Sequence, residues 1–234
     1  MNEIWFFILM FADLFLVLFA WKMGKQWLIA TIVMNLILVS TFGSKLITIF
    51  GFDTSVANIF YASIFIATDI LTEHHGKKEG YRSIWIGFLC LFGFVAFGQV
   101  ILQFDGIEQV AAVSESMDTL FSAVLRISIA SFIAYAIAQS FDIWFFHWIM
   151  KKTGKDRLLW FRNCGSTLTS QFIDSVIFFP LAFIGIVPLP ILINIIITGY
   201  ILKSMVAFFD TPFIYMSYLV KGQKAPGLEN KSKH

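Results

Sequence analysis

Long apolar segments separated by short polar ones make up most of the chain. A helix needs about 20 apolar residues to cross the hydrocarbon core of a bilayer. Seven segments are candidates, and they are Ile4–Trp21, Trp27–Phe50, Ala57–Leu71, Ile84–Phe104, Leu120–Met150, Thr167–Val187 and Leu189–Phe209. The third is short and the fifth is long, which indicates tilt or a helix that extends beyond the bilayer. The pattern predicts an all-α fold, a polytopic integral membrane helical bundle.

The break between the last two segments decides the helix count. Val187–Pro190 reads Val-Pro-Leu-Pro, and proline removes a backbone donor and disfavours helix at the residue before it. Two helices result if the chain breaks here, and one kinked helix if it only bends. The prediction is therefore six to seven transmembrane helices.

Composition supports a lipid environment. Of the 234 residues, 58% are hydrophobic and 14% are charged, against about 25% charged residues in soluble domains. Because no basic residue precedes Lys22, the first apolar segment does not match a cleaved secretory signal. We expect a single transmembrane helical domain over residues 1–220 and a polar, basic cytoplasmic tail over residues 221–234.

The basic residues predict the orientation, because Lys and Arg collect in cytoplasmic loops. Fourteen of the seventeen fall on one side of a seven-helix arrangement, and they are Lys22, Lys25, Lys77, Lys78, Arg82, Lys151, Lys152, Lys155, Arg157, Arg162, Lys221, Lys224, Lys231 and Lys233. This distribution places the N-terminus outside and the C-terminus inside. The expected location is the cytoplasmic (inner) membrane.

Several charged residues remain within the apolar segments, and they are Asp13, Lys45, Asp69, Arg126, Asp142, Asp174 and Lys203. Each costs about 3 kcal/mol at the centre of a membrane helix, and such residues usually face a bundle interior or a wet cavity. Two segments also carry polar stripes at helical spacing. The stripes consist of Ser128, Ser131, Tyr135, Gln139 and Asp142 in the fifth segment, and Asn163, Thr167, Gln171, Asp174 and Ser175 in the sixth. A Gln-x-x-Asp-x-x-x-Phe motif occurs in both stripes.

Each polar residue has a structural alternative to a functional role. Buried amides and hydroxyls commonly join helices, at about 0.6 kcal/mol each, but joining helices requires no ionisable group. We therefore favour a functional role for Asp142 and Asp174. Asp69 is either a solvated helix cap or part of a site, and Arg126 either pairs with acidic residues near its helix start or contacts substrate. Lys203 pairs with a neighbour in its structural interpretation.

Other chemistries find little support in the chain. The histidines lack metal-ligand spacing, and no GxxxxGK[ST] phosphate loop is present. No nucleophile-and-base pair lies within the apolar segments. We expect neither an enzyme nor a cofactor or metal.

Several motifs in one order resemble the queuosine precursor transporter family, formerly described as vitamin uptake transporters. Phe65–Lys78 is similar to its TDIxxExxGKK signature, with His75 where the family usually has an aromatic residue. The remaining matches are Leu125–Ile127 and Ala130–Tyr135 to RI…ASxxAY, Leu159–Phe178 to WxRN…ST..SQ..DS.IF, and Asp210–Pro212 to DTP. Together they extend from about residue 57 to residue 215.

The resemblance implies uptake of 7-deazaguanine bases such as 7-cyano- and 7-aminomethyl-7-deazaguanine. A carboxylate accepts the two parallel donors of such a base, and an amide can bind O6. We expect Asp142, Asp174, Gln139 and Gln171 to bind the base edge, and Tyr135 to stack on it. The supporting positions are Asn163, Arg126 and Asp69.

Alternatives remain at this point. The chain could transport another vitamin or nucleobase, act as the substrate-capture subunit of an ATPase-driven importer, or be a structural membrane subunit. Proton symport and passive exchange are both open. The partners we expect are a small-molecule substrate and the lipid bilayer, with no nucleic acid; a homo-oligomer is left open.

Overall fold

The protein is described by a computed structural model. The structure describes residues 1–154 and 159–220, except the side chains of residues 46, 52, 53, 110, 123, 159 and 205–211. Its elements are α1 (Asn2–Met23), α2 (Lys25–Phe42), β1 (Leu46–Ile49), β2 (Phe52–Ser55), α3 (Ala57–His75), α4 (Lys77–Ile101), the 3-10 helix η1 (Glu108–Val110), α5 (Ala111–Thr153), α6 (Leu159–Phe183) and α7 (Leu189–Val220). The predicted tail, residues 221–234, lies outside the described residues.

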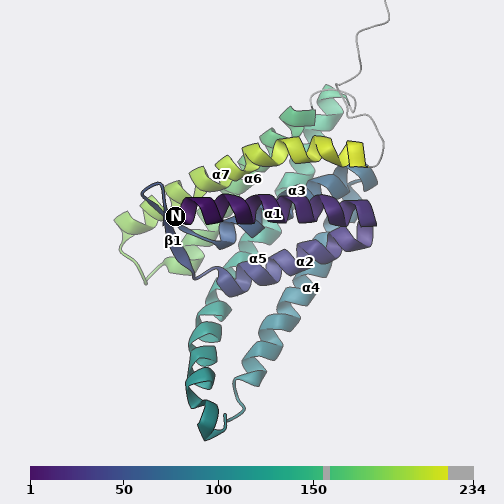
Figure 1. The fold of residues 1–234 in the computed structure, drawn as a ribbon. Coiled ribbons are helices and arrows are strands. Elements are labelled where there is room, and N and C mark those ends of the chain that lie inside the picture. The colour runs from purple at the N-terminus through teal and green to yellow at the C-terminus, as the bar shows by residue number, and fades with distance from the viewer. Residues whose placement is uncertain (155–158, 221–234) are drawn as a thin grey trace, which may run out of the picture.

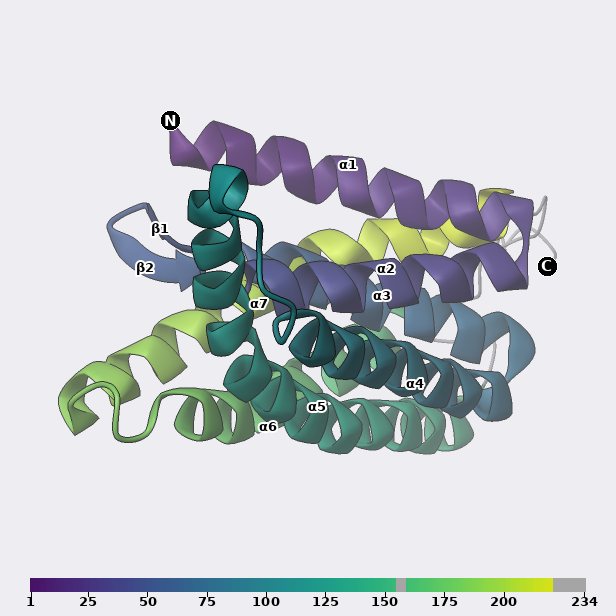
Figure 2. The ribbon, with the colours of Figure 1, turned by 90° about the horizontal axis from the view of Figure 1, so that it is seen from below.

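Successive α-helices run in alternating directions, so the connections gather at two ends of the bundle (Figures 1 and 2). We call one the basic end; it holds the α1–α2 and α3–α4 turns and the C-terminal ends of α5 and α7. We call the other the hairpin end; it holds β1, β2 and the α6–α7 connection. Glycines form two turns of the basic end, since Gly24 and Gly76 have φ values of 131° and 84°, a region that favours glycine.

α3 is the central helix of the bundle. Every residue from Ala57 to Glu73 is buried, because α1, α2, α4 and α7 all pack around this helix. A membrane helix surrounded by other helices has no need of a continuous apolar surface, which explains why the sequence pattern gave a short third segment. The polar residues of α3 consequently face other helices and not lipid.

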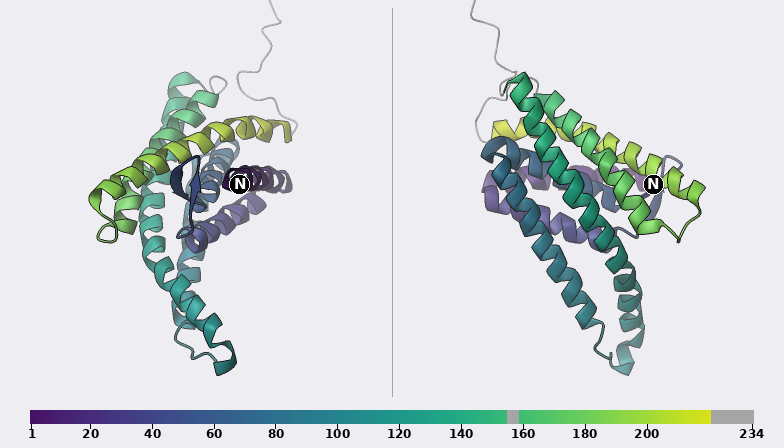
Figure 3. Two further views of the ribbon diagram at one scale, coloured as in Figure 1. Left: turned by 60° about the vertical axis from the view of Figure 1, so that its left-hand side comes forward. Right: turned by 180° about the vertical axis from the view of Figure 1, so that it is seen from behind.

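Four helices of the described chain, α1, α2, α4 and α5, are long and apolar enough to cross a membrane. A shorter apolar stretch, Leu189–Ser204, begins α7. At 43 residues, α5 is about 65 Å long, so it exceeds a hydrocarbon core of about 30 Å. Its first turns and the last turns of α4 extend away from the other helices (Figure 3). The predicted all-α multi-pass architecture is confirmed.

Two predicted boundaries are wrong. The second segment does not continue to Phe50, because α2 ends at Phe42 and the chain then forms the antiparallel β1–β2 hairpin. α6 begins at Leu159, so Arg162 belongs to a helix and not to a cytoplasmic loop. The last two segments are separate helices, since α6 ends at Phe183 and α7 begins at Leu189.

Candidate functional site

Buried polar residues of α3, α5, α6 and α7 form four successive layers along the bundle. On α6 they recur at about one helical turn, from Arg162 through Ser166 and Ser170 to Asp174, and all four are buried. α3 contributes Glu73, Asp69 and Tyr61 on one side. The layers are described below from the basic end toward the hairpin end.

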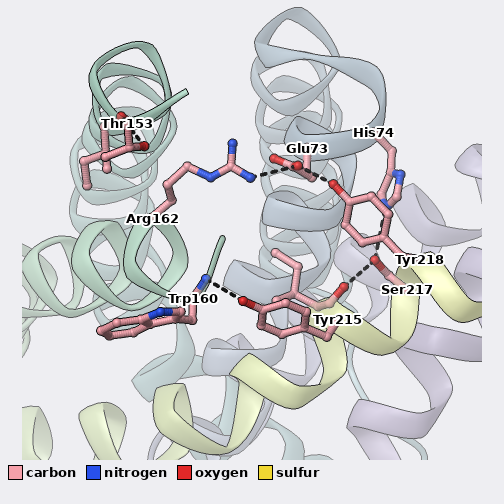
Figure 4. A network of polar contacts seen from close by, with 10 residues as sticks. Glu73, His74, Thr153, Trp160, Arg162, Tyr215, Ser217 and Tyr218 are labelled. Atoms are coloured by element: carbon pink, nitrogen blue, oxygen red, sulfur yellow. Dashed lines mark hydrogen bonds and ion pairs between the residues drawn. The ribbon is translucent and has the colours of Figure 1, made fainter. Parts of the chain in front are cut away.

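The first layer, which we call the Glu73 network, closes the basic end (Figure 4). The guanidinium of Arg162 donates to Glu73 Oε1 over 2.9 Å, and neither side chain is exposed. Tyr218 of α7 donates its hydroxyl hydrogen bond to the same oxygen. His74 Nε2 lies 2.9 Å from Ser217 Oγ. Three helices are thereby joined around one buried carboxylate.

Aromatic rings pack against this layer. The His74 ring lies 4.6 Å from that of Trp21 and 4.5 Å from that of Tyr218. Phe146 lies 5.3 Å beneath the Arg162 guanidinium carbon. The Phe146 ring has no polar edge, so it helps to exclude water from the ion pair, which strengthens the pair.

The second layer contains two acidic side chains in contact, and we call Asp69 and Asp142 the carboxyl pair. Both are almost fully buried, with 1% and 0% of their surface exposed. Their carboxyl groups are adjacent, because they accept hydrogen bonds from two hydroxyls that lie three residues apart on α6. Ser170 donates to Asp142 Oδ1 over 2.9 Å, and Thr167 donates to Asp69 Oδ2 over 3.2 Å. Asp69 is therefore not the solvated cap that we considered.

The third layer holds the two glutamines. The side-chain amides of Gln139 and Gln171 are fully buried, and within the described part of the chain neither their Nε2 nor their Oε1 atoms have a hydrogen-bond partner. Along α5, Gln139 lies between Tyr135 and Asp142. Along the antiparallel α6, Gln171 lies between Ser170, which bonds Asp142, and Asp174, which is linked to Tyr135 through Tyr61. Both amides therefore lie between the carboxyl pair and the Asp174 group. Unpartnered amides are costly in a protein interior, so this pair is the strongest sign of a ligand site.

The fourth layer surrounds Asp174. Lys203 Nζ of α7 lies 2.5 Å from Asp174 Oδ2, and Tyr61 of α3 donates to Oδ1 over 2.5 Å. The Tyr61 and Tyr135 rings meet edge to face at 6.1 Å. Asp174 is thus neutralised by a lysine of the protein. The structural interpretation of Lys203, a pairing with a neighbour, is confirmed.

A cavity leads from the hairpin end toward this fourth layer. Its volume is about 680 Å³, which is within the range of small-molecule sites. It lies between the β-hairpin and the facing parts of α6 and α7, and its lining includes Thr48, Phe178, Phe183, Asn194 and Thr198.

A neck continues inward from the cavity. It shares Gly43, Ser55 and Phe178 with the cavity wall and ends at Tyr61, Asp174 and Lys203. The neck encloses only about 20 Å³, room for about one water molecule. In this conformation the polar layers are consequently approached from the hairpin end and closed at the basic end.

The structure brings six of the eight predicted residues into layers two to four: Asp69, Tyr135, Gln139, Asp142, Gln171 and Asp174. Asn163 lies beside the Glu73 network on α6, with its Oδ1 atom buried and unpartnered among the described residues.

Arg126 lies elsewhere. Its Nη2 and Nε donate to the carbonyl oxygens of Ile184 and Leu181 at 2.6 and 3.4 Å, so it caps the C-terminal end of α6 and does not pair with Glu115 or Asp118. A cation suits that end of a helix.

The sequence analysis missed several residues of the layers. Tyr61 gave no signal in its apolar segment, and Arg162 was assigned to a loop. Glu73 lies in the TDIxxE signature, so the motif itself could have indicated it. Among the described residues no group of His, Cys, Asp or Glu is arranged to hold a metal ion.

Helices that span a bilayer, an interior of buried carboxylates and amides, and a cavity open at one end define a membrane transporter. The model of the family described as "Putative vitamin uptake transporter" matches residues 55–217. A curated relative from Bacillus subtilis (strain 168), named "Probable queuosine precursor transporter", is 32% identical over 92% of this chain and 93% of its own length. The chain belongs to this vitamin uptake transporter family. No solved structure matches.

Proposed function

We propose that this protein imports queuosine precursors, 7-deazaguanine bases, across the cytoplasmic membrane. The name of the Bacillus subtilis relative supports this substrate class, and the arrangement of polar groups supports a planar base with mixed donors and acceptors. The observation that carries the proposal is the pair of buried, unpartnered glutamine amides beside a carboxylate.

The chemistry of the base matches these groups. N1–H and the 2-amino group of a guanine-like base are parallel donors for carboxylate and amide oxygens. The Oε1 atoms of Gln139 and Gln171 receive no hydrogen bond from the described residues, and Asp142 lies three residues from Gln139 on α5. Gln139 and Gln171 supply amide donors for O6 and an acceptor for a ring N–H. Tyr135 supplies an aromatic face, and stacking of a base on such a face is worth about 1–3 kcal/mol.

The two ends of the bundle give this binding a direction. Lys22, Lys25, Lys77 and Lys78 lie at the basic end, so the positive-inside rule makes that end cytoplasmic. The cavity then opens to the outside, and the Glu73 network closes the cytoplasmic side. Substrate enters beneath the β-hairpin, the neck widens to admit it, and release requires the Glu73 network to separate.

The test is uptake in bacterial cells that cannot synthesise 7-deazaguanines and lack their own importer. With 7-cyano-7-deazaguanine in the medium, cells that express this chain should accumulate labelled base and form queuosine in tRNA. Expression of Gln139→Leu at equal membrane abundance should not restore queuosine. Absence of queuosine with the wild-type chain present in the membrane would overturn the proposal.

A competition series distinguishes the other transport functions. Unlabelled guanine, adenine and water-soluble vitamins are added in excess over labelled 7-cyano-7-deazaguanine. Inhibition by the 7-deazaguanines alone supports the proposal. Uptake of a vitamin by the chain, with no uptake of the labelled base, would assign it to another solute.

A further inference from the structure

We propose that Asp69 and Asp142 together bind one proton and that this proton enters the cell with each imported substrate. The inference rests on the proposed import function and adds its driving force. It follows from the contact between the two carboxyl groups, from their surroundings and from their place in the layers.

The contact itself requires a proton. Two carboxylates at hydrogen-bonding distance repel each other, and burial removes the water that would screen them. One carboxylic acid that donates to one carboxylate converts this repulsion into a strong hydrogen bond. The pair then titrates as a unit. Within it, Ser170 donates to Asp142 and Thr167 donates to Asp69, and the proton is shared between the two carboxyl groups.

Three cations of the described helices bind other acceptors. Arg162 is bound to Glu73, Lys203 to Asp174, and Arg126 to the carbonyl groups at the end of α6. Each of these cations is therefore committed to another acceptor among the described residues. A second negative charge in the carboxyl pair is costly inside the membrane, at several kcal/mol.

The other ionisable groups near the pair are distributed over all the helices that pack around it. They are Tyr61 and Glu73 on α3, Tyr81 on α4, Tyr135 and His147 on α5, Arg162 and Asp174 on α6, and Lys203 and Tyr218 on α7. Asp13 on α1 is a separate buried carboxylate, which accepts two bonds from Asn35 at 3.1 and 3.2 Å. Among the described residues, Asp69 is the one that presents a second carboxyl group to Asp142.

The position of the pair couples proton and substrate. It lies between the glutamines of the third layer and the Glu73 network: Asp142 is three residues from Gln139 on α5, and Asp69 is four residues from Glu73 on α3. While the Glu73 network is closed, burial keeps the proton bound. When the network separates, water reaches the carboxyl pair, both groups ionise, and the O–H bond breaks to release the proton into the cytoplasm together with the base.

The experiment uses purified full-length protein in proteoliposomes that contain a pH-sensitive dye, with the membrane potential clamped. Addition of 7-cyano-7-deazaguanine outside should acidify the lumen. An acid-outside gradient of one pH unit should support up to about tenfold accumulation of base for one proton per base. Exchange of labelled for unlabelled base without a gradient measures transport independently of protons.

Asp69→Asn should lose the stimulation by the gradient, measured as the ratio of uptake with and without it. Asp13→Asn, a buried aspartate outside the pair, should keep the wild-type ratio. Because the dye measurement needs only the wild-type protein, the result stands even if Asp69→Asn does not fold.

The outcomes separate the two proposals. Wild-type exchange of base with neither acidification nor stimulation would overturn proton coupling and leave the import function intact. Absence of any exchange would overturn the import function, and the coupling with it.

Discussion

Arg162 of α6 donates a hydrogen bond to Glu73 of α3 over 2.9 Å, and both side chains are completely buried. The bond joins the central helix to a helix of the periphery at the end of the bundle where the connections are basic. It forms one boundary of the polar layers, and the cavity at the hairpin end forms the other. The first two predictions concern this bond.

Removal of Arg162 should destabilise the protein severely. Arg162→Met leaves Glu73 as a buried charge, and loss of one partner from a buried ion pair typically costs about 3–5 kcal/mol. The variant should lower the melting temperature of the detergent-solubilised protein and its yield in the membrane. Arg162→Met/Glu73→Gln should recover part of the loss. Arg82→Met, which removes an exposed pairing with Glu79, is the control; additive effects of the two Glu73-network changes would contradict the pairing.

Tyr218→Phe should loosen the basic end without unfolding the protein. The variant deletes one hydrogen bond to Glu73 and keeps the aromatic packing against His74. A cysteine at Ser166, one turn inward from Arg162, should then react faster with a membrane-impermeant thiol reagent in inside-out vesicles. The background lacks Cys90 and Cys164. Equal labelling rates with and without Tyr218→Phe would show that this bond does not restrict access.

Gln139→Leu and Gln171→Leu should separate function from stability. Each replaces an amide that has no partner among the described residues, so stability should stay equal or rise, since a buried unpaired polar group costs about 1–3 kcal/mol. Uptake of 7-cyano-7-deazaguanine should fall at least tenfold. Gln99→Leu is the matched control, because Gln99 of α4 donates to the carbonyl oxygen of Phe121, 18 residues before Gln139 on α5. A large drop in melting temperature with Gln139→Leu or Gln171→Leu would indicate a structural role for that amide instead.

The neck should favour a neutral substrate over a cationic one. The 7-aminomethyl base carries a cationic amine that a free carboxylate would attract, but Lys203 already neutralises Asp174 at 2.5 Å. We expect unlabelled 7-cyano-7-deazaguanine to compete at least tenfold more effectively than the 7-aminomethyl base. Lys203→Met, which frees Asp174, should narrow that difference. Stronger competition by the aminomethyl base in the wild type would place its amine elsewhere.

The orientation is testable with single cysteines. Asn194→Cys lines the cavity at the hairpin end and should be labelled by an impermeant thiol reagent in intact cells. Bound substrate should slow this labelling. Lys78→Cys at the basic end should react only after permeabilisation. The reverse pattern would invert the topology.

The family motifs and the polar stripes predicted most of the residues that the fold brings into the polar layers. Asp142, Gln139, Gln171 and Asp174 were predicted together because residues at helical spacing share one face of a helix, and lipid excludes such residues from the outer face. The number and nature of the apolar segments likewise follow from the sequence, since hydrophobic length is a local property. The failures at residues 43–50 and at Leu159 lie at segment ends, where apolar character alone does not distinguish a strand or a loop from a helix.

Partnerships between helices were decided by the tertiary structure alone. The sequence shows that Asp69, Asp142, Glu73, Arg162, Asp174 and Lys203 are charged, but it does not show which charge meets which. The fold assigns Arg162 to Glu73 and Lys203 to Asp174, so the remaining two carboxyl groups meet each other. Pairing depends on the order of helices around α3, which distant segments of the chain determine jointly. The assignment distinguishes Glu73 and Asp174, which are each paired with a cation, from Asp69 and Asp142, which we propose to share a proton.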